Sequence, residues 1–317
     1  MIADFAFIVV GLVLLYFGAE GLVRGSSALA LKLGLTPLVV GLTVVAYGTS
    51  TPELVVSVKA ALSGQPGIAV GNVVGSNIFN IAVILGIASV IFPIRVNFQL
   101  LRLDVPIMVG VSLLLMAFFA NGMLERWQAA VLFAGIVAYT VGSIIYAKKT
   151  ATPDVQAEYA ESVGDKKKPA TLWLDLVFII GGLGVLVAGS RFLVDGSIGV
   201  ARSWGVSEAV IGLTIVAAGT STPELAASIV AALKKEPDIA IGNIVGSNIY
   251  NILCILGIAG LITPLPLGGV AWTDLYVMLG FSLALVPILI TGFVIKRWEG
   301  FVLLASYGGY LAWMWPK

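Results

Sequence analysis

The chain has 317 residues, of which 59% are hydrophobic and 11% are charged, and its formal net charge is +1. Soluble proteins carry roughly 25% charged residues, so a soluble globular enzyme is nearly excluded. The chain has no His and one Cys, which excludes a disulfide framework, a Cys/His zinc site and a His-dependent catalytic triad. The near-zero net charge gives no indication of nucleic-acid binding.

Apolar stretches long enough to cross a bilayer recur along the whole chain, which predicts an all-α polytopic membrane protein. We expect ten transmembrane helices, near residues 4–23, 36–62, 68–92, 103–120, 127–147, 172–193, 207–233, 239–262, 273–294 and 299–315. The first span lacks a preceding basic segment and recurs later in the chain. We therefore expect it to belong to the mature fold rather than to a cleaved signal.

One long polar segment, residues 148–171, separates residues 1–147 from residues 172–317 and predicts a solvated linker. The linker's side of the predicted membrane would hold 13 of the 18 basic residues. By the positive-inside rule, we expect the linker in the cytoplasm and the N-terminus outside, in a multi-pass protein of the cell (plasma) membrane. The lipid bilayer is then its main partner, and no protein partner is evident.

The two parts of the chain on either side of the linker are related by a repeat. After a shift of 171 residues, residues 41–90 align without gaps with residues 212–261, and 33 of these 50 positions are identical. Each part holds five predicted spans, and an odd number reverses the direction in which the second part enters the membrane. We expect two inverted five-helix repeats, which in secondary transporters place the binding site near the midplane.

The second and seventh spans each contain the string Gly-Thr-Ser-Thr-Pro-Glu, at residues 48–53 and 219–224. Proline disfavours helical geometry at the preceding residue, so each string predicts a broken helix. In the first string, Ser50 or Thr51 can cap the half-helix that follows, which places Glu53 in its first turn. The half-helix before the break should leave the carbonyls of residues 46–48 without intrahelical partners. Such carbonyls, hydroxyls and a carboxylate at membrane depth predict a cation site.

A packing role is the alternative for Glu53 and Glu224, because each carboxylate could hydrogen-bond a neighbouring helix only to hold it in place. An ionisable group at the bilayer centre costs roughly 2.5–3.5 kcal/mol on insertion scales. Two such groups at matching positions beside matching breaks favour a functional role.

The third and eighth spans carry a second repeated motif, Gly-Asn-x-Val-Gly-Ser-Asn-Ile-x-Asn, at residues 71–80 and 242–251. Its first Asn, its Ser and its last Asn are spaced by four and share one helix face, which could point at the glutamates. Alternatively, these side chains only hold membrane helices together. The candidate ligands here are Ser76, Asn80, Ser247 and Asn251. Both interpretations stay open for Asn72, Asn77, Asn243 and Asn248, and also for Ser57 and Ser228, one turn beyond each Glu.

The paired motifs resemble the two α-repeats of the cation/calcium exchanger superfamily, and the chain is most similar to its prokaryotic sodium/calcium exchangers. The resemblance implies that Glu53 and Glu224 bind Ca²⁺ together with backbone carbonyls around Thr49 and Thr220. It also implies that the first and sixth spans slide past an eight-helix core. The implied Na⁺ ligands are the hydroxyls of Ser50, Ser76, Ser221 and Ser247 and the carbonyls near Ala46 and Ala217.

One departure from the family's pattern concerns charge. Relatives often carry an acidic residue at one of the positions matching Asn80 and Asn251, whereas this chain has Asn at both. The two glutamates then supply two negative charges, which balance one Ca²⁺ or two Na⁺. The stoichiometry and electrogenicity implied by the resemblance are therefore left open.

The preferred hypothesis is a secondary antiporter, not an enzyme, in which Na⁺ entry drives Ca²⁺ out by alternating access. The transported ions would be Ca²⁺ and Na⁺, with no cofactor. An H⁺- or K⁺-coupled calcium exchanger is one alternative, although proton-coupled relatives typically carry a His that this chain lacks. A passive cation channel is another, because broken helices in inverted repeats also occur in channels.

Overall fold

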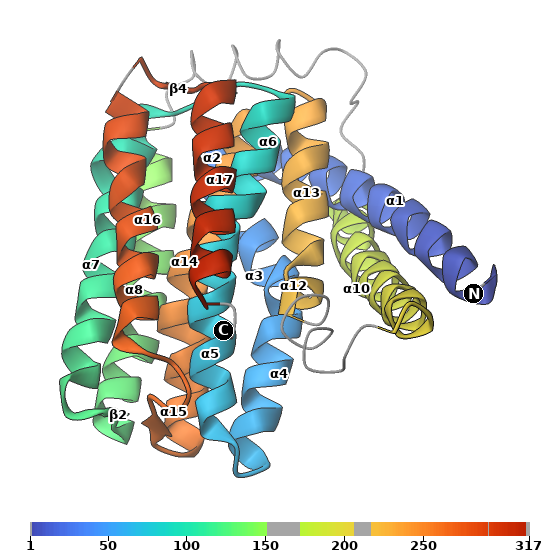
Figure 1. Cartoon of the computed structure of the whole chain (residues 1–317). Coiled ribbons are helices and arrows are strands. Elements are labelled where there is room, and N and C mark those ends of the chain that lie inside the picture. The colour runs from blue at the N-terminus through green and yellow to red at the C-terminus, as the bar shows by residue number, and fades with distance from the viewer. Residues whose placement is uncertain (1, 151–171, 206–216, 291, 315–317) are drawn as a thin grey trace.

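The computed structural model describes residues 2–150, 172–205, 217–290 and 292–314, almost all of them helical (Figure 1). Within these residues, seven helical segments are long and apolar enough to cross a membrane. Two further helical segments, Pro37–Thr49 and Thr51–Leu62, are bent against each other and together would make an eighth span. The seven are Ile2–Leu33, Pro66–Ile91, Leu100–Asn121, Arg126–Lys149, Leu172–Ser203, Pro237–Ile262 and Trp272–Ile290. The predicted class of helical polytopic membrane protein is confirmed.

The elements of the first part of the chain follow in order. They are α1 (Ile2–Leu33), α2 (Pro37–Val40), η1 (Gly41–Val45), α3 (Ala46–Thr49), α4 (Thr51–Leu62), α5 (Pro66–Phe79), η2 (Asn80–Leu85), α6 (Gly86–Ile91), β1 (Ile94–Arg95), η3 (Leu100–Asp104), α7 (Val105–Phe118), η4 (Phe119–Asn121), β2 (Met123–Leu124) and α8 (Arg126–Thr150). The segments η1, η2 and η3 are π-helical and η4 is a 3₁₀ turn.

The second part repeats this order where it is described. Its elements are α10 (Leu172–Ser203), α12 (Ala217–Thr220), α13 (Thr222–Leu233), α14 (Pro237–Tyr250), the π-helical η6 (Asn251–Ile255), α15 (Leu256–Ile262), β3 (Leu265–Pro266), α16 (Trp272–Ile290), β4 (Val294–Ile295) and α17 (Arg297–Met314). Residues 206–216, the start of the predicted seventh span, lie outside the described residues, as does most of the predicted linker.

The first and sixth predicted spans are each about ten residues too short, because α1 continues to Leu33 and α10 to Ser203. The predicted spans ended close to charged side chains, Glu20 and Arg24 in the first span and Arg191 and Asp195 in the sixth. In the structure, the two of these side chains that belong to α1 have partners. Glu20 pairs with Lys234, and the guanidinium of Arg24 lies 4.7 Å from the ring centroid of Phe178.

Helices α1 and α10 are antiparallel and pack against each other along their length. The pair lies to one side of the other helices (Figure 1). Glycines line the contact at intervals of seven residues. A Cβ on Gly18 would lie 2.8 Å from the backbone N of Leu186, and one on Gly189 would lie 2.8 Å from that of Leu15. The close approach therefore requires glycine at these positions.

The two parts of the chain are also joined by two short antiparallel ribbons. In one, β1 pairs with β4 so that Ile94 faces Ile295, and in the other, β2 pairs with β3 so that Leu124 faces Leu265. A shift of 171 residues turns each pairing into the other. Between these ribbons, Pro66–Ile91 and Pro237–Ile262 are the two most buried of the seven long segments and form the centre of the core.

Candidate cation site

Both predicted helix breaks are present. Ser50 separates α3 from α4 with φ −80° and ψ 9°, and Ser221 separates α12 from α13 with φ −88° and ψ 9°. At the first break the axis bends by 47°, and a proline follows in the first turn of the next helix in both cases. Glu53 and Glu224 lie in those first turns, 0% and 1% exposed.

The local hydrogen bonding at the first break differs from the sequence-based prediction in two ways. The carbonyl of Ala46 is not without an intrahelical partner, because it accepts a bond from the N–H of Ser50 at 3.0 Å. The helix bends without losing this bond. Ser50 also makes no side-chain cap for α4, because its hydroxyl is directed across the site instead. The carbonyl of Ala46 lies 3.5 Å from the hydroxyl of Ser247.

The serines of the breaks contact the glutamate of the other part of the chain, not their own. Ser50 Oγ donates to Glu224 Oε1 at 2.8 Å, and Ser221 Oγ donates to Glu53 Oε1 at 2.9 Å. Two further predicted serines, Ser247 and Ser76, contact the serines of these bonds. Ser247 Oγ is 3.0 Å from Ser50 Oγ, and Ser76 Oγ is 3.2 Å from Ser221 Oγ. All six side chains are buried, so the structure brings these predicted ligands together.

The asparagines that open the second motif support the glutamate helices. Asn72 Nδ2 donates to the carbonyl of Glu53 at 3.1 Å and to Ser57 Oγ at 3.0 Å. Asn243 Nδ2 donates to the carbonyl of Glu224 at 3.2 Å and to Ser228 Oγ at 2.9 Å. These four side chains therefore hold the backbone behind each carboxylate.

The predicted carbonyl positions lie on the short helices before the breaks. Thr49 ends α3, and its hydroxyl donates to Asn243 Oδ1 at 3.1 Å. Ala217 and Thr220 begin and end α12, the counterpart of α3. Both short helices therefore lead directly into the serines that contact the glutamates.

Four buried oxygens of the predicted ligands accept no hydrogen bond from the described residues. They are Glu53 Oε2, Glu224 Oε2, Asn80 Oδ1 and Asn251 Oδ1. Leaving a buried acceptor without a partner costs roughly 1–3 kcal/mol, and more when it is charged. No Lys or Arg of the described residues forms an ion pair with either glutamate. The unpartnered atoms are carboxylate and amide oxygens, which are the ligand atoms that hard cations such as Ca²⁺ and Na⁺ prefer.

Some side chains around the cluster were not predicted as part of it. The ring of Tyr47 stacks on that of Tyr250 with centroids 4.5 Å apart, and its hydroxyl lies 2.6 Å from Thr140 Oγ1. Met108 of α7 contacts Asn248, with Sδ 3.7 Å from Nδ2. These contacts come from tertiary packing, and the only sequence signal is that Tyr47 precedes the first string by one residue.

The fold is that of a helical membrane protein, and the buried oxygens are of the chemical kind that binds hard cations. The family described as sodium/calcium exchanger protein matches this chain over residues 4–145 and again over residues 174–315. The chain therefore belongs to that family, within the cation/calcium exchanger superfamily. This is a family of membrane ion transporters rather than of enzymes.

Individual relatives match over nearly the full chain. The sequence is 40% identical over 314 residues to the putative antiporter CaxA of Alkalimonas amylolytica, with 98% of each chain covered. It is 34% identical over 343 residues to the sodium/calcium exchanger MaX1 of Methanosarcina acetivorans, with 97% of each covered. The solved structure of the sodium-calcium exchanger NCX_Mj superposes with a TM-score of 0.84 at 31% identity and covers 98% of each chain. The predicted resemblance is confirmed.

Proposed function

We propose that this protein is a secondary antiporter that exchanges Na⁺ for Ca²⁺ by alternating access and normally extrudes Ca²⁺. The observation that carries the proposal is the pair of buried carboxylates, each with one oxygen bonded to a serine and one oxygen without a partner. A bound cation would supply the partner that these oxygens lack. Two negative charges balance one Ca²⁺ or two Na⁺, so the two ions would compete for Glu53 and Glu224, as exchange requires.

We further propose how the ligands divide between the ions. Ca²⁺ would be bound by Glu53 and Glu224 with the carbonyls of Thr49 and Thr220, and Asn80 and Asn251 would add neutral amide oxygens. The support is that one buried oxygen of each of these four side chains has no hydrogen-bond partner among the described residues, and that Thr49 is the residue directly before Ser50, which bonds Glu224. The proposed Na⁺ ligands are the hydroxyls of Ser50, Ser76, Ser221 and Ser247 and the carbonyls of Ala46 and Ala217.

For the architecture, we propose ten spans arranged as two inverted repeats, residues 1–147 and residues 172–317. This arrangement is supported by pairs of contacts in which adding or subtracting 171 from the residue numbers of one contact gives the other. The bond from Ser50 to Glu224 becomes the bond from Ser221 to Glu53, and one ribbon becomes the other. The basic residues concentrated on the linker's side support an N-terminus outside the cell membrane and a cytoplasmic linker, residues 148–171.

Uptake of ⁴⁵Ca²⁺ into Na⁺-loaded proteoliposomes tests this function. We expect uptake that requires the outward Na⁺ gradient and disappears in Glu53→Gln. Glu125→Gln is the matched control, because Glu125 is an exposed carboxylate outside the cluster. Uptake driven equally by K⁺ or H⁺ gradients would indicate a different coupling ion. Uptake that follows the membrane potential with no counter-ion would indicate a channel, and full uptake by Glu53→Gln would refute the site.

A further inference from the structure

Four asparagines form a crossed network between α5 and α14 and their π-helical continuations. Asn77 Nδ2 donates to the carbonyl of Asn248 at 3.2 Å, and Asn248 Nδ2 donates to the carbonyl of Asn77 at 3.3 Å. Asn80 Nδ2 then donates to Asn248 Oδ1 at 3.0 Å, and Asn251 Nδ2 donates to Asn77 Oδ1 at 2.9 Å. Each of the four side chains is 1% exposed, so water does not compete for these bonds.

The network determines how two amides, those of Asn80 and Asn251, are oriented. A primary amide carries its donors on one side and its acceptor on the other. The NH₂ groups of Asn80 and Asn251 bond the network, so their Oδ1 atoms are turned away from it, and these two atoms have no partner. A flip of Asn80 would place its oxygen against Asn248 Oδ1. Asn248 cannot flip in response, because its oxygen would then face the carbonyl of Asn77.

We propose that Asn77 and Asn248 are positioning residues that hold the amide oxygens of Asn251 and Asn80 toward the transported cation. The inference rests on the proposed function, because it takes those oxygens as ion ligands. Each oxygen is held by the opposite part of the chain, and the orientation is set through backbone carbonyls that do not rotate. Without the network, either amide can turn its NH₂ toward the site, where it repels a cation.

The same network accounts for Asn, rather than Asp, at both ligand positions. A carboxylate at residue 80 or 251 has no NH₂ to donate and would place an oxygen against Asn248 Oδ1 or Asn77 Oδ1. The positioning residues therefore favour a neutral ligand at both positions. The formal charge of the site then comes from Glu53 and Glu224 alone.

A double-mutant cycle on Ca²⁺ affinity tests the proposal. The variants are Asn248→Leu, which has similar volume and no polar atoms, and Asn80→Ala, singly and together, with Ca²⁺ binding measured at equilibrium on the purified full chain. We expect Asn248→Leu alone to weaken binding by roughly 10–100-fold, the usual effect of removing a residue that orients a ligand. In the Asn80→Ala background the same change should have little further effect, because no amide remains to be oriented.

The control is the crossed combination with Asn251→Ala. Asn248 does not contact the amide of Asn251, so the effects of Asn248→Leu and Asn251→Ala should multiply. If Asn248→Leu weakened Ca²⁺ binding by the same factor in the Asn80→Ala and Asn251→Ala backgrounds, Asn248 would only support packing. That result would overturn the proposal. Asn77→Leu gives the mirror-image test, coupled to Asn251 and independent of Asn80. Asn248→Ser replaces Asn248→Leu in the same cycle if thermal unfolding shows that the leucine variant does not fold.

Equilibrium Ca²⁺ binding does not depend on which ion drives transport. Absence of Na⁺-driven uptake would therefore sink the proposed antiport and leave this cycle interpretable. Conversely, multiplicative effects in both backgrounds would sink the positioning role and leave the antiport standing.

Discussion

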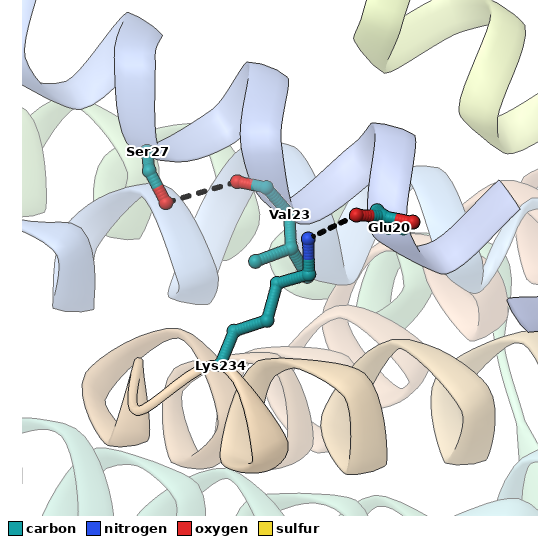
Figure 2. Close-up of polar contacts among 4 residues, drawn as sticks. All are labelled: Glu20, Val23, Ser27 and Lys234. Atoms are coloured by element: carbon teal, nitrogen blue, oxygen red, sulfur yellow. Dashed lines mark hydrogen bonds and ion pairs between the residues drawn. The ribbon is translucent and has the colours of Figure 1, made fainter. Parts of the chain in front are cut away.

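Glu20, near the middle of α1, forms an ion pair with Lys234 at the C-terminal end of α13, with Oε1 and Nζ 2.6 Å apart (Figure 2). Two turns further along α1, Ser27 Oγ lies 3.2 Å from Glu236 Oε1. Both contacts fasten the α1–α10 pair to the turn that follows α13. The positions matching Glu20 and Lys234 in the repeat are Arg191 and Ser63, which cannot form such a pair. The ion pair therefore has no counterpart at the matching positions of the repeat.

Removing this ion pair should loosen α1 from α13 with little loss of overall stability. Both side chains are about one-third exposed, and exposed pairs contribute roughly 0–1 kcal/mol. In Lys234→Gln we expect faster amide hydrogen exchange at the end of α13 and a nearly unchanged Tm. The charge swap of Glu20→Lys with Lys234→Glu should restore protection. Unchanged exchange in Lys234→Gln, or no restoration by the swap, would show that the pair does not hold α1.

Ion binding should stabilise the fold only when both glutamates are present. A ligand at 100 times its Kd stabilises the native state by about 2.7 kcal/mol, so saturating Ca²⁺ should raise the Tm of the natural chain. Glu53→Gln and Glu224→Gln should each abolish that rise, because a neutral amide replaces half of the site's charge. The Ca²⁺-dependent change in Tm is measured by thermal unfolding in detergent, with Ca²⁺ and with a chelator. The control variant Glu125→Gln should show the same change as the unmutated chain. A full Ca²⁺-dependent rise in Glu224→Gln would contradict the site.

The crossed serine bonds predict crossed energetic coupling. Hydrogen bonds to charged groups contribute roughly 1.5–3 kcal/mol, so Ser50→Ala should weaken Ca²⁺ binding by about 10–100-fold. That effect should be lost in Glu224→Gln, whose carboxylate Ser50 contacts, if residual binding is measured with a sensitive ⁴⁵Ca²⁺ assay. It should persist in Glu53→Gln. Coupling of Ser50 to Glu53 instead would mean that the serines act within their own half.

The glycine contact between α1 and α10 should tolerate no side chain. Gly189→Ala places a Cβ 2.8 Å from the backbone N of Leu15, so the helices must separate and Tm should fall by several degrees. Gly181→Ala on the same helix is the control, because no heavy atom lies within 4 Å of its Cβ. That variant should be neutral or stabilised by up to about 1 kcal/mol through helix propensity. Equal Tm values for the two variants would argue against the close approach.

The parts of the site that could be predicted from sequence depend on local chemistry. Proline after Thr51 predicts the break in the helix, and the spacing of Ser76 and Asn80 predicts a shared face. The pairing of Ser50 with Glu224 could not be predicted, because it depends on how two distant segments cross. The true length of α1 was also hidden, because the partners of Glu20 and Arg24 are distant in sequence: Glu20 pairs with Lys234, and Arg24 lies over the ring of Phe178.

The crossed hydrogen bonds mean that neither half of the chain contains both partners of either serine–glutamate bond. Residues 1–147 alone would carry Glu53 without Ser221, and residues 172–317 alone would carry Glu224 without Ser50. Each half supplies what the other half's carboxylate needs. A chain cut between the halves would therefore lack both serine–glutamate bonds until its two fragments had associated again.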